Sequence, residues 1–143
     1  MELALSEKEQ STQVYDLYLK GNCLLAKNKL DLSKRFYLRV LKLIKKGLPV
    51  NTAIYADTLH NLGMIAEQEQ KHEAAIEYYQ LAVTVNPQRS MTWIFLAKLY
   101  FERFQNLKHD EDYQLGINAL NQADTGTVHF PAVKYLKNKF NIA

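Results

Sequence analysis

The most reactive side chains are scattered along the sequence and form no known catalytic or metal-binding motif. The histidines fall at four separate positions: His60, His72, His109 and His129. None lies four residues from another histidine or from the single cysteine, Cys23, as a metal site on one helix requires. No glycine-rich phosphate loop follows a strand pattern. The sequence therefore predicts a protein with no metal, no cofactor and no enzymatic activity.

His60 is the one histidine with polar neighbours at helical spacing, because Asp57 precedes it by three residues and Asn61 follows it. A lone histidine in such a group is more often the polar lining of a binding surface than a catalytic base. Cys23 lies on an otherwise apolar helix face, where a small buried hydrophobe is expected. We therefore interpret His60 as part of a binding surface and Cys23 as part of the core.

Length and composition indicate one domain. The chain of 143 residues is 48% hydrophobic, which suits a single core over residues 1–143. One cysteine is incompatible with an internal disulfide framework. The first ten residues, MELALSEKEQ, lack the basic-then-apolar pattern of a secretory signal, and no apolar run approaches the ~18 residues that span a membrane. We therefore expect a cytoplasmic protein.

The segment from Ala56 to Pro87 carries the clearest structural pattern. Its apolar residues recur at helical spacing in two runs, separated by the polar stretch QEQKHE. The small residues Gly63, Ala75 and Ala82 stand where two helices would have to approach closely. Pro87 ends the unit because proline cannot continue a helix. The pattern predicts two amphipathic helices folded back on each other.

Similar helix pairs are expected on both sides of this segment. Before it, a capping box of Ser6 and Glu9 opens a helix that reaches Ala26, and a second helix follows the polar turn KNKLD. After it, a helix over about 88–104 is followed by the polar stretch QNLKHDED, which we expect to form an enlarged turn. A returning helix and a closing helix that begins at Pro131 complete the chain.

The central segment resembles the tetratricopeptide repeat (TPR), a helix–turn–helix of 34 residues. Its match to the family's Trp, Leu-Gly, Ala, aromatic, Ala and Pro positions is carried by Leu59, Leu62, Gly63, Ala75, Tyr79, Ala82 and Pro87. Ala66 departs from the family's usual tyrosine. Thirty-four residues further on, the same first-helix positions hold Trp93, Leu96, Ala97 and Tyr100.

The resemblance implies an all-α, TPR-like α-solenoid of antiparallel helix pairs that form a right-handed superhelix. The repeats would cover about 6–46, 52–87 and 88–124, with a capping helix at about 131–141. Whether the chain is complete or part of a longer array is left open.

In the TPR family the first helices of successive repeats line a concave groove. The resemblance places these residues in it: Tyr15, Tyr18, Asn22, Leu25, Asp57, His60, Asn61, Met64, Gln68, Met91, Ile94, Phe95, Lys98 and Phe101. The helix around Trp93 is apolar almost all round, so Ile94, Phe95 and Phe101 are expected to point into the groove. A partner segment and the chain's own termini both remain possible occupants.

One TPR subgroup binds the C-terminal carboxylate of chaperone tails through two asparagines and three basic residues. Asn22 and Asn61 match the two asparagines, but the basic positions hold Tyr18, Met91 and Phe95. A desolvated carboxylate would find no charge partner there. We therefore do not expect binding of chaperone tails.

A basic stripe is the second candidate surface. Arg35, Arg39, Lys42 and Lys46 recur at i, i+4, i+7 and i+11, with Lys34 and Lys45 beside them. The stripe could dock an acidic protein, a nucleic acid or an anionic lipid, or it could be the solvated back of a helix.

The sequence predicts a non-enzymatic protein-interaction module, adaptor or chaperone-like, that binds a helical or extended partner segment in an apolar groove. The layout is also similar to bacterial type III secretion chaperones. The alternatives are a structural subunit that self-associates through the same surface and, ranked lower, nucleic-acid or acidic-partner docking through the basic helix 34–46.

Overall fold

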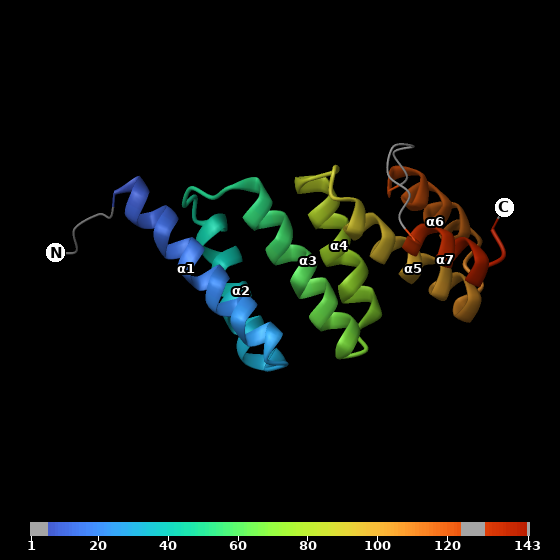
Figure 1. Ribbon diagram of the computed structural model, residues 1–143, viewed down its shortest axis with the longest axis horizontal. Coiled ribbons are helices and arrows are strands. Elements are labelled where there is room, and N and C mark those ends of the chain that lie inside the picture. Colours follow the sequence, from blue (N-terminus) through green and yellow to red (C-terminus); the bar gives the residue numbers. More distant parts are fainter. Residues whose placement is uncertain (1–5, 124–130, 143) are drawn as a thin grey trace.

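The computed structural model describes residues 6–123 and 131–142, and that part of the chain contains seven helices and no strand. The helices are α1 (Glu7–Ala26), α2 (Leu30–Lys45), α3 (Thr52–Gln68), α4 (His72–Val85), α5 (Ser90–Leu107), α6 (Asp110–Ala123) and α7 (Pro131–Lys139). Figure 1 shows them following one another in chain order along the long axis. The all-α prediction is confirmed. Two of the predicted features, the start of the N-terminal stretch and His129, lie outside the described residues.

Short reversals fold the helices into pairs. α1 packs on α2, α3 on α4 and α5 on α6, and successive pairs meet through α2 with α3 and α4 with α5. Each reversal contains one residue in the left-handed region, namely Asn28, Gln70 and Lys108. A single left-handed residue turns the chain out of a helix while the last carbonyls keep backbone partners. The predicted capping box at Ser6 and Glu9 is present.

The prediction of an enlarged turn between α5 and α6 is wrong. The stretch QNLKHDED adds helical turns instead, because α5 continues to Leu107 and α6 begins at Asp110. The acidic residues at the start of α6 suit the positive end of the helix dipole. One of them, Asp112, is buried and accepts two hydrogen bonds from Arg103 of α5. The polar stretch is therefore anchored between the two helices rather than looped into solvent.

A glycine facing an aromatic ring sets the closest approach within each pair. A Cβ placed on Gly21 would lie 2.5 Å from the Tyr37 ring, and one on Gly63 would collide with the Tyr79 ring. In the third pair the roles are exchanged, because the glycine, Gly116, is on α6 and faces the ring of Phe101 on α5. No larger residue fits at these glycines unless the ring moves.

The apolar side chains form successive clusters along the array. Ile94 and Phe101 are buried at 4% and 1% exposure against α6 and against Val133 and Leu136 of α7. The expectation that they point into a groove is therefore wrong. Of the occupants that the sequence left open, the C-terminal helix covers these two side chains. Cys23 is exposed, so the expectation that it is buried is also wrong.

Replacing Gly63 with alanine is expected to destabilise the protein, because the added Cβ would overlap the Tyr79 ring. Overpacking costs roughly 1–3 kcal/mol. The gain in helix propensity, about 1 kcal/mol, offsets only part of this. Urea unfolding should show a lower midpoint with an unchanged m-value.

The control is the same substitution in a Tyr79→Leu background, where the ring is absent and the added methyl group has room. There the loss should shrink or change sign. Equal losses in both backgrounds would contradict the steric explanation.

Candidate binding surface

The first helices of the three pairs, α1, α3 and α5, are joined side by side through their side chains. The Tyr18 hydroxyl of α1 donates a hydrogen bond to Asp57 of α3. Farther along, Lys98 of α5 forms a 2.9 Å ion pair with Glu67 of α3. These contacts define one surface, which we call the first-helix face.

The predicted groove residues differ widely in their accessibility. The exposed ones are Tyr15, Gln68 and Met91. The partly buried ones are Tyr18, Asn22, Leu25, Asp57, Met64, Phe95 and Lys98. The buried ones are His60, Asn61, Ile94 and Phe101. The first-helix face is thus a mixed polar and apolar surface, rather than the continuous apolar groove that the sequence suggested.

A hydrogen-bond network covers the part of this face between α1 and α3. The Asn61 amide donates to the Tyr37 hydroxyl at 3.1 Å and to Asn22 and Asp57, each at 3.3 Å. The Tyr37 hydroxyl donates to Asn22, and burial raises the pKa of Tyr37 to about 12, so it stays protonated. The side chains of Asn22, Asn61 and Tyr37 therefore already form hydrogen bonds within the chain.

Asp57 occupies the centre of the network. Its carboxylate accepts hydrogen bonds from Tyr18 and Asn61 and forms an ion pair with Arg89, which directly precedes α5. The chain's own carboxylate thus already uses the donors that an incoming C-terminal carboxylate would need. Sequence analysis missed Arg89, because a partner 32 residues from Asp57 leaves no local pattern.

The His60 side chain is buried rather than exposed on the first-helix face. Its ring lies 5.3 Å from that of Tyr79 and 4.9 Å from that of Phe95, and its Nδ1 forms a 2.9 Å hydrogen bond with Thr92. Burial lowers the pKa of His60 to about 4; the Arg89 guanidinium acts in the same direction and Asp57 opposes it. The imidazole is therefore neutral near pH 7 and joins α3, α4 and α5.

An open depression lies on the first-helix face between α3 and α5. It measures about 580 Å³, and the side chains at its centre are Met64 and Gln68 from α3 and Phe95, Lys98 and Glu102 from α5. Glu67, Gln70 and His72 complete its lining. Met64 and Phe95 supply apolar contact area, while the charge of Lys98 is paired with Glu67.

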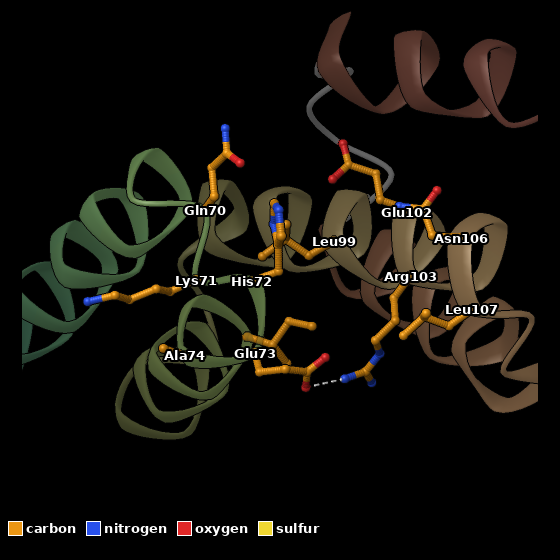
Figure 2. Close-up of a pocket in the computed structure, with 11 residues that line it drawn as sticks. Gln70, Lys71, His72, Glu73, Ala74, Leu99, Glu102, Arg103, Asn106 and Leu107 are labelled. Atoms are coloured by element: carbon orange, nitrogen blue, oxygen red, sulfur yellow. Dashed lines mark hydrogen bonds and ion pairs between the residues drawn. The ribbon is translucent and has the colours of Figure 1, made fainter.

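The depression adjoins a second pocket of about 490 Å³, with which it shares Gln70, His72 and Glu102. Figure 2 shows Glu73, at the start of α4, facing Arg103 of α5, with Asn106 and Leu107 beyond it. Ile76, Leu99 and Leu107 provide apolar surface, and Leu107 is 60% exposed. This pocket exists because α5 extends to Leu107, which the sequence analysis did not anticipate.

Arg103 closes one side of the pocket with its charge already neutralised. It forms a 2.8 Å ion pair with Glu73, drawn in Figure 2, and two hydrogen bonds to Asp112 at 2.7 and 2.8 Å. The hydrogen bonds to Asp112 raise the pKa of Arg103. The pocket therefore suits apolar side chains better than an anion.

The basic stripe lies on α2, away from the first-helix face. Arg35, Arg39, Lys42, Lys45 and Lys46 are exposed, whereas Lys34 forms a 3.4 Å ion pair with Glu69 in the α3–α4 turn. Across residues 6–123 and 131–142, no group of three or more His, Cys, Asp or Glu side chains is arranged to hold a metal ion. Nor is any helix of that part long and apolar enough to cross a membrane.

Sequence comparison agrees with the paired-helix geometry. Two models of the tetratricopeptide repeat match the chain, one at residues 56–89 and the other at residues 17–46. The chain thus contains tetratricopeptide repeats at these two places. The matched ranges cover α2 and α4 in full, most of α3 and the second half of α1.

A solved structure shares the fold of this TPR protein. The TPR domain of Sgt2 from Aspergillus fumigatus is 23% identical and has a TM-score of 0.62, and the alignment covers 90% of this chain and 77% of that chain. No curated protein sequence matches the TPR chain.

The buried His60 predicts that this TPR protein loses stability in mild acid. The native state keeps the imidazole neutral, with a pKa of about 4 against an ordinary value of 6.5. Between these values the unfolded chain binds the extra proton, so the free energy of unfolding falls as pH drops from 6.5 towards 4. The loss can reach roughly 3 kcal/mol at 1.36 kcal/mol per pKa unit.

The measurement is urea unfolding at steps across this pH range for the native chain and for His60→Gln. Glutamine can keep a hydrogen bond to Thr92 but does not titrate. Its stability should depend much less on pH in this window. Identical slopes for the two proteins would rule out His60 as the cause.

Proposed function

We propose that the chain binds an extended or helical segment of a partner protein in the depression between α3 and α5 and in the pocket that adjoins it. A partner protein is the appropriate class of ligand because TPR repeats form protein-interaction modules. The role is that of a non-enzymatic adaptor or chaperone-like module.

One observation carries this proposal: the depression and the pocket adjoin, and both have apolar side chains in their lining beside cations that are already paired. Met64 and Phe95 line the first, and Leu99 and the exposed Leu107 line the second. A peptide with two apolar anchors can bury them there while Lys98 and Arg103 keep their ion pairs.

The polar part of the first-helix face has a different role in this proposal. The network around Asp57 is satisfied internally, so a partner gains little by replacing those hydrogen bonds. The partner segment would therefore follow α3 and α5 and leave the α1–α3 junction largely uncovered. Self-association through the same surface remains a prediction, which light scattering over a range of concentrations would test.

The binding proposal predicts that Gln68→Arg together with Leu107→Asp weakens peptide binding by about tenfold or more, equivalent to ~1.4 kcal/mol. Both positions line the proposed path and are exposed, so circular dichroism and thermal unfolding should not change. The probe is a peptide selected against the native chain from a random peptide library, with affinity measured by fluorescence anisotropy.

The matched control places the same changes on α6, as Gln114→Arg and Leu115→Asp, where both side chains are exposed. The control should bind the peptide with nearly native affinity. Equal weakening in both variants, or NMR shift changes that map away from Met64, Phe95 and Leu99, would contradict the proposed site.

A further inference from the structure

The cations of this chain fall into two groups. Over residues 52–107, every lysine and arginine forms an ion pair: Lys71, Arg89, Lys98 and Arg103. On α2, only Lys34 does. Among the described residues, no carboxylate forms an ion pair with Arg35, Arg39, Lys42, Lys45 or Lys46. This helix therefore carries a row of unpaired cations, which residues 52–107 do not.

This arrangement destabilises the isolated helix. Arg35 and Arg39, and likewise Lys42 and Lys46, are like-charge pairs at i, i+4, and each such pair costs a few tenths of a kcal/mol. The stripe from Arg35 to Lys46 covers 11 residue-to-residue steps, or about 16 Å at 1.5 Å per residue. It is long enough to face a partner helix of about three turns.

Two exposed leucines flank the stripe. At 100° per residue, Leu32 and Leu38 lie about 60° to either side of its axis. Their exposed fractions are 42% and 41%, and neither belongs to a core cluster. The accessible face of α2 thus has a cationic centre between two apolar edges.

We infer that this face of α2 docks an acidic amphipathic helix of a partner protein. Carboxylates at i, i+4, i+7 and i+11 on such a helix would repeat at the spacing of Arg35, Arg39, Lys42 and Lys46. Apolar residues beside the carboxylates would cover Leu32 and Leu38. The surface is separate from the proposed peptide site, because the α2 side chain that contacts the α1–α3 network, Tyr37, lies on the opposite side of the helix.

Other polyanions fit this face less well. A nucleic acid bound through phosphates makes no use of the leucines, and the nearest aromatic residue, Phe36, is half-buried with Lys20 over its ring. A membrane-binding helix would place its apolar residues together on one face, not on two edges. A second copy of this chain offers no matching acidic helix among its described residues: α4 has Glu73 and Glu77, but Gln80 and Thr84 at the next two positions.

The test uses a synthetic helical peptide with glutamates at i, i+4, i+7 and i+11 and leucines on both sides. A peptide of the same composition with the glutamates spread around the helix is the control. Anisotropy with the full chain should show binding of the first peptide and at least about tenfold weaker binding of the second. No binding of the first at about 50 mM salt, or equal binding of both, would overturn the inference.

Variants locate the contact. Arg35→Glu, Arg39→Glu and Lys42→Glu together should weaken binding by about tenfold or more, and Leu32→Ser with Leu38→Ser by about threefold or more. The neutral set Arg35→Gln, Arg39→Gln and Lys42→Gln replaces the first if charge reversal impairs folding. The charge-matched control, Lys108→Glu, Lys134→Glu and Lys137→Glu, should bind within about twofold of the native chain.

Single-stranded RNA and phosphatidylserine vesicles serve as competing polyanions. The inference expects neither to displace the peptide at equal charge concentration. It is overturned if either binds more tightly than the peptide, or if the leucine substitutions leave peptide binding unchanged. The Gln68→Arg, Leu107→Asp variant should bind the acidic peptide normally, which separates failure here from failure of the proposed groove function.

Discussion

The contact between a glycine and an aromatic ring within each helix pair is the constraint on which the rest of this structure depends. Because Gly21 and Gly63 have no Cβ, the rings of Tyr37 and Tyr79 can pack directly against the backbone of the facing helix. Both rings are then fully buried, and their hydroxyls reach polar partners, Asn22 for Tyr37 and Glu67 for Tyr79. The glycine–ring contact therefore allows close packing of the two helices and also places both tyrosine hydroxyls beside hydrogen-bond partners.

The polar tips of these tyrosines connect the packing of the pairs to the surface that they present. Tyr37 enters the network of Asn22, Asn61 and Asp57, and Glu67, which accepts from Tyr79, also pairs with Lys98. The spacing of the helices and the chemistry of the first-helix face are therefore set together. A carboxylate-binding surface would require unpaired cations, but the cation of this network, Arg89, already forms an ion pair with Asp57.

The third pair departs from this scheme, and the departure creates the pocket. Gly116 and Phe101 have exchanged helices, so Phe101 turns towards α6 and α7 rather than towards the first-helix face. α5 is also longer than α4 and extends beyond it, held by the bonds of Arg103 to Asp112 and Glu73. The pocket that includes Leu107 lies at this end, whereas the unpaired cations of the basic stripe lie on α2.

Local patterns determined the helices and their pairing. The 3.6-residue periodicity, the small residues at Gly63, Ala75 and Ala82 and the ends at Pro87 and Pro131 depend only on neighbours in the chain, and the observed helices follow them closely. Tertiary structure decided which side of α5 is covered. Ile94 and Phe101 belong to a helix that is apolar almost all round, so its periodicity does not show which neighbouring helix covers each side. In the folded chain, residues of α6 and α7 pack against these two side chains. The pairing of Asp57 with Arg89, the enclosure of His60 and the length of α5 likewise depend on residues that meet only after folding, so no local pattern could show them.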